Sequence, residues 1–324
     1  MSSRRAVRSG GSPQQFRSLS RRGFLTGAAA TAAATALAAC GRTSPVSSSG
    51  GSAGSSSGSR GSLTIGAIPD QDPEVLQRLY GTVADSMSTA LDLDVSYTPV
   101  TDYGAAVSLF CTGDLDLVWF GGLTGVQARL QTPGAVPVAQ RDIDADFHSV
   151  FVVNTATGLT PADDLRPLAD LRFTYGSQTS TSGRLMPAYF LREAGVDPEG
   201  FPGGPGFSGS HDATLALVAS GSYQAGAVNE QVWLARTEAG EVDPALVAYA
   251  RTPGYSDYHW LLGPRAAQRL GGPDRLVGYF TGLSPDRPAD AGVLDLFGAG
   301  SFIPTEAANY RQIEEIGRDL GLIS

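Results

Sequence analysis

The chain has 324 residues, a hydrophobic fraction of 42% and a net charge of −9. This length allows two domains of ordinary size, each with a substantial core. Residues 1–39 contain six arginines and no acid, which leaves 17 basic against 32 acidic residues, a net charge of −15, for the remainder. Because nucleic-acid binding requires a basic face, this acidic body argues against a nucleic acid as partner.

The N-terminal segment carries two export motifs in order. The stretch "SRRGFL" contains the twin arginines Arg21 and Arg22, and a weakly apolar run then ends at "LAAC", which resembles a bacterial lipobox. The run is too short to span a bilayer. We therefore predict that residues 1–39 are a twin-arginine lipoprotein signal peptide, removed before a lipidated Cys40. A fortuitous alanine-rich tail is the alternative.

Residues 40–61 are mostly Ser and Gly, which is typical of a flexible tether behind the lipidated cysteine. The body beyond the tether contains one further cysteine, Cys111, so the sequence predicts no disulfide within it. Cys111 has no Cys or His at metal-ligand spacing, and we interpret it as a small buried apolar residue. We expect neither a metal ion nor a cofactor.

Apolar patterns along the body alternate between strand and helix. "SLTIGAIP", "LDVSYTPV" and "LDLVWFGG" indicate strands, with helical patterns between them, and this pattern restarts after residue 170. We expect an α/β protein of two lobes, each a mostly parallel sheet flanked by helices. Residues 62–153 with 252–324 would form lobe 1, and 154–251 lobe 2. Two connections between lobes predict a hinge, with the ligand in the cleft.

The stretch "GSQTSTSGRLMPAY" places three hydroxyl residues, Ser180, Thr181 and Ser182, at the start of a helix that follows a strand. One of them would suffice as a helix cap. A helix N-terminus also offers free N–H groups and a partial positive charge, to which hydroxyls add neutral donors. These residues alone leave a plain cap and an anion site as equal alternatives.

The body resembles the phosphate-, phosphite- and phosphonate-type binding proteins of ABC importers. The resemblance covers nearly all of residues 62–324, through "GAIPDQDPEVL", "TDYGAAV", "LDLVWFGGLTGVQA", "GSQTSTSGRLMPAYFL", "SGSHDATLALVASG" and "TPGYSDYHWLL". "IPDQD" and "WFGGLTGVQAR" look nearest to a branch named for selenate transport. The resemblance implies the type II periplasmic binding protein fold and capture of a small oxyanion outside the cytoplasm. It also implies a lipid-anchored monomer that delivers the oxyanion to a permease and its ATPase.

The same resemblance assigns the ligand-binding residues. It implies that Ser180, Thr181 and Ser182 hold the oxyanion, with His211 as a further donor, Tyr103 from lobe 1 and Asp257 at the hinge. Phe120 stands where the family often has a tyrosine, and Gln231 where it often has an acid. Loss of that acid weakens the case for an aminoalkyl phosphonate. A carboxylate at position 257 would favour a protonated oxyanion such as phosphite or a phosphonate monoanion over selenate or a sulfonate.

Two other functional classes compete with capture. Ser182, His211 and Asp257 include the residue types of a hydrolase triad, but no G-x-S-x-G motif surrounds any serine. A sensor lipoprotein without transport is a further alternative. Among single residues, His148 and His259 are interpreted as structural, and the acids of "DQD" at 70–72 as complements of a helix dipole.

Overall fold

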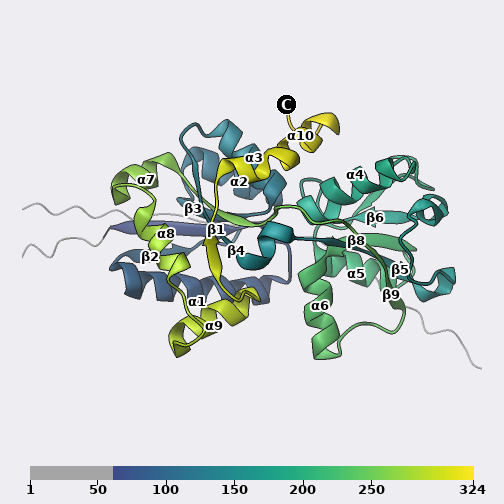
Figure 1. Ribbon diagram of the computed structural model, residues 1–324, viewed down its shortest axis with the longest axis horizontal. Coiled ribbons are helices and arrows are strands. Elements are labelled where there is room, and N and C mark those ends of the chain that lie inside the picture. The colour runs from purple at the N-terminus through teal and green to yellow at the C-terminus, as the bar shows by residue number, and fades with distance from the viewer. Residues whose placement is uncertain (1–60) are drawn as a thin grey trace, which may run out of the picture. The chain divides into compact units, whose positions relative to one another are not determined.

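The computed structural model describes residues 61–324. The predictions for the twin arginines, for Cys40 and for all of the tether before residue 61 lie outside the described residues. Two β-sheets with helices on both faces make up the described part (Figure 1). Among its helices, none combines the length and the apolar character needed to cross a bilayer.

The first sheet has six strands in the order β11-β4-β10-β3-β1-β2. They are β1 (Ser62–Ala67), β2 (Asp94–Tyr97), β3 (Leu117–Phe120), β4 (Val136–Arg141), β10 (His259–Leu262) and β11 (Phe302–Pro304). The helices around it are α1 (Pro73–Leu91), α2 (Tyr103–Thr112), α3 (Gly122–Gln131), α7 (Pro264–Leu270), α8 (Asp274–Thr281), α9 (Pro288–Phe297) and α10 (Arg311–Asp319). Helices α2 and α3 lie on one face, and α1 and α9 on the other (Figure 1). We call residues 61–141 and 259–324 the first lobe.

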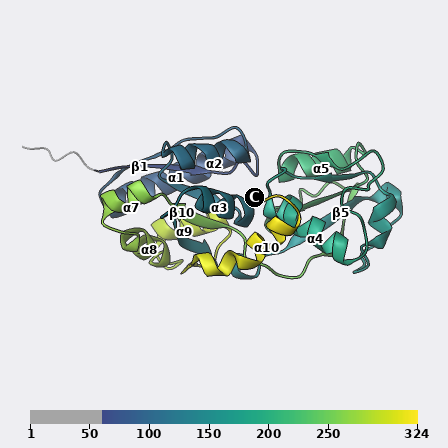
Figure 2. The same cartoon turned by 90° about the horizontal axis from the view of Figure 1, so that it is seen from above.

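The second sheet has five strands in the order β7-β6-β8-β5-β9. They are β5 (Ser149–Asn154), β6 (Phe173–Tyr175), β7 (Gly206–Phe207), β8 (Ala225–Asn229) and β9 (Leu246–Arg251). Its helices are α4 (Met186–Glu193), α5 (His211–Ala219) and α6 (Glu230–Ala239). We call residues 149–251 the second lobe. The C-terminal helix α10 contacts the turn before α4, and Figure 2 shows the two helices next to each other.

Both sheets are mixed, whereas the sequence predicted mostly parallel ones. Strand β10 runs antiparallel to β3 and β4, and β5 runs antiparallel to β8 and β9. Each of these two strands follows a segment that crosses from the other sheet. The chain therefore enters each sheet at the edge where the parallel strands of that sheet end. The entering strand, β5 or β10, must then run antiparallel to them. Strand β5 also lies in the second sheet, whereas the sequence predicts that residues up to 153 belong to lobe 1.

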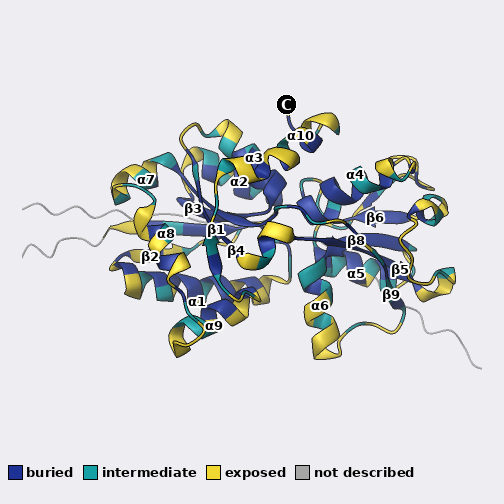
Figure 3. Ribbon diagram, in the orientation of Figure 1, coloured by how far each residue is buried: buried dark blue, intermediate teal, exposed yellow. Residues whose placement is uncertain are grey.

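Apolar side chains cover both faces of the strands. On β5, Val150 and Val152 pack on one side with Leu215 and Val228, while Phe151 packs on the other side with Phe173. This explains why "HSVFVVN" is apolar without alternation, since a strand buried on both faces has no polar side. Figure 3 shows the buried strands in dark blue and the exposed residues on the outer faces of the helices.

Two segments join the lobes, residues 142–148 and 252–258. They pair with each other, because the backbone N–H groups of Phe147 and Tyr255 each donate to the carbonyl of the other at 2.8 and 3.0 Å. The first segment begins with a 3₁₀ turn, Asp142–Asp146. Arg141, just before it, makes a two-pronged ion pair with buried Asp144 and donates to the Phe297 carbonyl at 2.8 Å. The start of the first crossing segment is therefore fixed to the first lobe.

We predict that Arg141→Met lowers the free energy of unfolding by about 3–5 kcal/mol, because it leaves the Asp144 carboxylate buried without its partner. The double variant Arg141→Met/Asp144→Leu should recover most of that loss. Urea unfolding of the purified protein measures both. A double variant as unstable as Arg141→Met would contradict this account of the hinge.

Candidate oxyanion site

Polar side chains from both lobes meet where the carboxyl ends of the parallel strands face the other sheet. Tyr103 begins α2, Ser180–Ser182 follow β6, and His211 begins α5 after β7. Asp257 comes from the second crossing segment. A Cβ built on Gly121 would lie 3.1 Å from Thr181 Oγ1 and 3.3 Å from Asp257 Oδ1, so these two side chains press against the start of α3.

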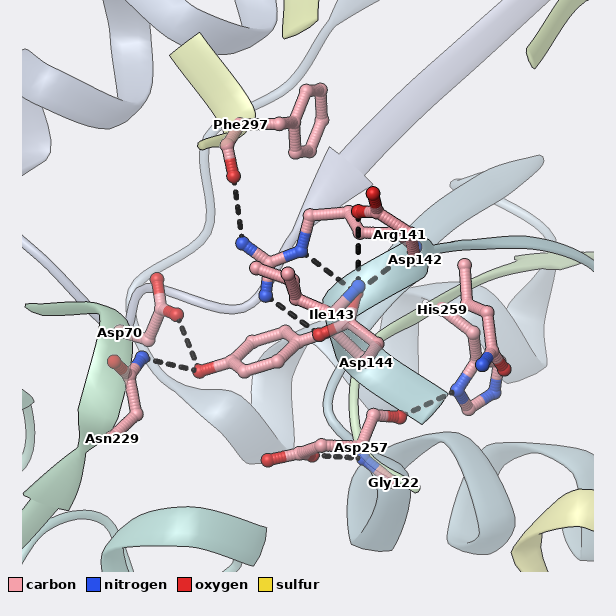
Figure 4. Close-up of polar contacts among 12 residues, drawn as sticks. Asp70, Gly122, Arg141, Asp142, Ile143, Asp144, Asn229, Asp257, His259 and Phe297 are labelled. Atoms are coloured by element: carbon pink, nitrogen blue, oxygen red, sulfur yellow. Dashed lines mark hydrogen bonds and ion pairs between the residues drawn. The ribbon is translucent and has the colours of Figure 1, made fainter. Parts of the chain in front are cut away.

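Asp257 has one carboxylate oxygen fixed and one free. Oδ1 accepts a hydrogen bond of 2.8 Å from the Gly122 N–H at the start of α3 (Figure 4). Oδ2 is buried and has no partner among the described residues. Burial raises the pKa of Asp257 to about 7, while the Gly122 N–H and nearby Thr181 oppose the rise. The carboxyl can therefore hold or release a proton near neutral pH.

The three hydroxyls after β6 have different partners. Ser180 Oγ accepts from the Gly183 N–H at 2.9 Å, as a helix cap does. Thr181 Oγ1 accepts from the Leu123 N–H of the first lobe, also at 2.9 Å. An accepted hydrogen bond leaves a hydroxyl its own proton to donate. The capping and donor hypotheses are thus compatible at Ser180, whereas Thr181 bonds the start of α3 instead of capping its own helix.

Residues 61–324 contain five buried side chains with a polar atom that has no hydrogen-bond partner. Three of them lie in this region: Tyr103 Oη, Ser182 Oγ and Asp257 Oδ2. Burial raises the pKa of Tyr103 well above its usual value, so its hydroxyl keeps its proton. Unpaired buried polar atoms are costly and therefore rare in folded proteins. Two donors and one titratable carboxyl are thus available to a polar ligand.

His211 is buried and lies close to the Ser180 hydroxyl. A Cβ built on Gly183 would lie 2.9 Å from Ser180 Oγ and 3.3 Å from His211 Cε1. Nδ1 of His211 accepts from the Asn229 N–H at 3.3 Å. Burial lowers the pKa of His211 to about 4, so the ring is neutral and its proton lies on Nε2. His211 can therefore act as a neutral donor.

Two other residues assigned by resemblance have different surroundings. Phe120 is fully buried and packs edge-on against Phe110 in the core of the first lobe. Neighbouring side chains of a strand point to opposite faces, and Trp119 rather than Phe120 lines an outer cavity bordered by both lobes. Gln231 lines the same cavity, which has a volume of about 430 Å³.

The remaining histidines lie in structural settings. His259 packs at a tilt on Tyr310 with ring centroids 4.1 Å apart, and burial lowers its pKa to about 4. Figure 4 shows its ring beside the Asp257 carbonyl, at 3.3 Å. His148 Nδ1 bonds the Thr252 carbonyl at 2.8 Å, which links the two crossing segments. In the described part of the chain, no group of His, Cys, Asp or Glu is arranged to hold a metal ion.

Sequence reasoning missed three residues beside His211: Asp70, Asn229 and Tyr258. Asp70 had been grouped with Asp72 as a complement to the dipole of a helix. Asp72 does cap α1, but Asp70 is buried and accepts from the Tyr258 hydroxyl at 2.8 Å. Asn229 donates to the same hydroxyl at 3.1 Å. These partners lie 188 and 29 residues from Tyr258, so no local pattern could reveal them.

Main-chain groups join the two lobes directly. The His211 N–H donates to the Asp70 carbonyl at 3.0 Å, and the Leu123 N–H donates to Thr181. The Asp72 N–H donates to the Asp212 carboxylate at 2.9 Å. The lobes are therefore in contact around the unpartnered atoms, and a ligand there would touch both of them.

A family model for the periplasmic substrate-binding proteins of phosphonate ABC transporters matches residues 65–310. The chain therefore belongs to this family and is the substrate-binding component of an importer rather than an enzyme. It is 48% identical over 268 residues to the probable ABC transporter phosphite binding protein PhnD1 of Prochlorococcus marinus (strain MIT 9301). That match covers 81% of this chain and 90% of the relative.

Solved structures agree with this assignment. The PhnD1 structure in complex with methylphosphonate superimposes with a TM-score of 0.79 and covers 81% of this chain and 99% of its own. A binding protein component of a phosphonate transporter from Pseudomonas aeruginosa, 17% identical, gives a TM-score of 0.69 over 79% of this chain and 85% of its own. The second comparison supports the fold alone.

The raised pKa of Asp257 predicts how stability depends on pH. Folded Asp257 binds its proton more tightly than the unfolded carboxyl, whose pKa is near 3.8. The unliganded protein should thus lose stability as pH rises from about 4 to 7. Asp257→Asn should remove part of this slope and make the protein more stable than the parent at pH 8, by up to about 4 kcal/mol. Urea unfolding at several pH values measures it.

Asp286→Asn removes an exposed acid and is the matched control for the change in net charge. It should keep the slope of the parent. An Asp257→Asn variant with the slope of the parent would show that this carboxyl is already ionised in the folded protein.

Proposed function

We propose that this protein captures phosphite and small phosphonate monoanions and delivers them to its permease. The observation that carries the proposal is the set of three buried, unpartnered atoms: Tyr103 Oη, Ser182 Oγ and Asp257 Oδ2. The two hydroxyls can donate to ligand oxygens. Asp257 can accept a proton from a ligand P–OH group. Binding of methylphosphonate by a relative that is 48% identical supports this ligand class.

The charge of the ligand is met without a positively charged side chain. Arg141 is already paired with Asp144. The neutral donors Ser180, Thr181, Ser182 and His211 stand at the starts of helical segments, whose free N–H groups and dipoles favour an anion. Neutral donors suit a protein that must bind and release its ligand, because no charged side chain of the protein has to lose its water when the ligand binds.

A single proton shared by Asp257 and the ligand accounts for the choice among oxyanions. Phosphite and phosphonate monoanions carry a P–OH group, whereas selenate and sulfate are fully ionised near neutral pH. Against these, an ionised Asp257 would face a second negative charge in a buried site. The selenate and sulfonate alternatives would therefore require Asp257 to be protonated before the ligand binds.

Capture requires no chemical step. Tyr103 belongs to the first lobe and Ser182 and His211 to the second, so a ligand that bonds to all three favours the closed arrangement through contacts that only this arrangement offers. The closed form is the one we propose to dock on the permease. We propose further that the protein acts as a monomer at the cell membrane, held by a lipid on Cys40.

The ligand hypothesis predicts a defined pattern in thermal-shift and calorimetric titrations at pH 8. Phosphite and methylphosphonate should bind, and sulfate and selenate should not. Ser182→Ala should weaken methylphosphonate binding tenfold or more, since a hydrogen bond to a charged group contributes about 1.5–3 kcal/mol. Its unliganded stability should stay near that of the parent, because Ser182 Oγ bonds nothing within the described residues.

Ser180→Ala and Ser108→Ala are the comparisons. Ser180 also caps the Gly183 N–H, so its loss should cost about 1 kcal/mol of stability in addition to affinity. Ser108 is exposed on α2, away from these residues, and its substitution should change neither quantity. Selenate binding as tight as that of methylphosphonate, or full affinity in Ser182→Ala, would overturn the proposed site.

The anchor hypothesis makes a separate prediction. Cys40→Ser should release the protein from membranes after a salt wash, because the lipid chain rather than the acidic body would hold it there. Replacing Arg21 and Arg22 by Lys should block export by the twin-arginine route. Fractionation of cells that express each variant measures both effects. Retention of Cys40→Ser on washed membranes would contradict the lipoprotein assignment.

A further inference from the structure

The outer cavity of about 430 Å³ lies next to the proposed oxyanion site. It is bordered by Trp119, Arg141 and Phe297 of the first lobe and by Asn229, Gln231 and Leu234 of the second. Asp70 and Tyr258 also line the cavity. Among the described residues that line it, none is a proposed donor to the oxyanion. Part of the cavity wall therefore separates the outer cavity from the proposed oxyanion site.

Three residues make up this partition: Asp70, Asn229 and Tyr258. Each of them lines the outer cavity. Each also contacts His211, which is not part of the cavity wall. The His211 N–H donates to the Asp70 carbonyl at 3.0 Å, and Nδ1 accepts from the Asn229 N–H at 3.3 Å. Nε2 lies 3.5 Å from the Tyr258 hydroxyl. His211 thus lies against all three residues of the partition.

The Tyr258 hydroxyl is fixed by a directional set of hydrogen bonds. Asn229 Oδ1 accepts from the Val232 N–H at the start of α6, which leaves Asn229 Nδ2 to donate to Tyr258. The hydroxyl must then use its own proton for Asp70 Oδ2, at 2.8 Å. Asp70 belongs to the first lobe and Asn229 to the second. The hydroxyl is therefore fixed between the lobes when they are closed.

The Tyr258 ring is held as firmly as its hydroxyl. It stacks on Trp119 with centroids 5.8 Å apart and an angle of 16°, and it meets Phe147 edge-on. The Arg141 guanidinium lies 5.2 Å from its centre on the side of the cavity. Only 3% of the residue is exposed. Displacing it would also leave the buried Asp70 carboxyl without its hydrogen-bond donor, which is costly.

We propose that Tyr258, held by Asp70 and Asn229, sets the upper size of the ligand by closing the oxyanion site off from the outer cavity. This inference rests on the proposed function and narrows its substrate class to phosphite and phosphonates with a very short substituent. A longer alkyl chain would have to displace the Tyr258 hydroxyl from both lobes. With the side chain removed, such a substituent would enter the outer cavity.

Calorimetric titration with methyl-, ethyl- and propylphosphonate tests this, because the three carry the same headgroup and differ only in length. The parent should bind propylphosphonate at least tenfold more weakly than methylphosphonate. Tyr258→Ala should raise the ratio of propyl- to methylphosphonate affinity at least tenfold over that of the parent. Tyr258→Leu, which keeps apolar volume in the stack but cannot reach Asp70, should shift the ratio the same way and serves if the alanine variant does not fold.

Two variants separate the wall from other effects. Tyr258→Phe keeps the ring and should leave the ratio near that of the parent, while it weakens all three ligands. Leu234→Ala enlarges the outer cavity at a residue that is 47% exposed, without touching the partition, and should change nothing. An unchanged ratio in both Tyr258→Ala and Tyr258→Leu, or a parent that binds propyl- and methylphosphonate equally, overturns the inference alone. A parent that binds no phosphonate or phosphite overturns the proposed function as well.

Discussion

The proposed chemistry depends on one buried carboxyl group whose two oxygens have different surroundings. The start of α3 holds Asp257 Oδ1 through the Gly122 N–H, and Oδ2 remains open. Because burial moves the pKa of Asp257 to about 7, the group is poised to share one proton with a ligand. Gly121 has to lack a side chain for this arrangement, since a Cβ would crowd both Thr181 and Asp257. The neutral donors on the other lobe then need only hold the remaining oxygens.

Much of this arrangement follows from strand order and helix starts, which explains why parts of it could be predicted. The serines and threonine at 180–182 lie between a buried strand and a helix, and this position can be predicted from the sequence. The hydrogen bonds that Ser180 and Thr181 accept could not be predicted, because they depend on which backbone N–H groups face these side chains in the fold. The position of Asp72 at a helix start is equally local, and its side chain caps α1.

The failures have a common physical origin in contacts between distant parts of the chain. Asp70 was grouped with a neighbouring helix start, yet its carboxylate bonds Tyr258, 188 residues away. Phe120, assigned to the ligand by resemblance, packs against Phe110 of α2, and its contact with the ligand stays a prediction. The sequence predicts strand β5 in the wrong sheet, because a continuous apolar run indicates that a strand is buried but not which strands pair with it.

The bonds that join the lobes around the site have an evolutionary consequence. Three of them have main-chain donors, and the one from the His211 N–H to the Asp70 carbonyl is main-chain on both sides. Among point substitutions, only a change to proline removes a backbone N–H donor. A lineage could therefore exchange the side chains that face the ligand, and so acquire a new solute, while the geometry of closure is inherited unchanged.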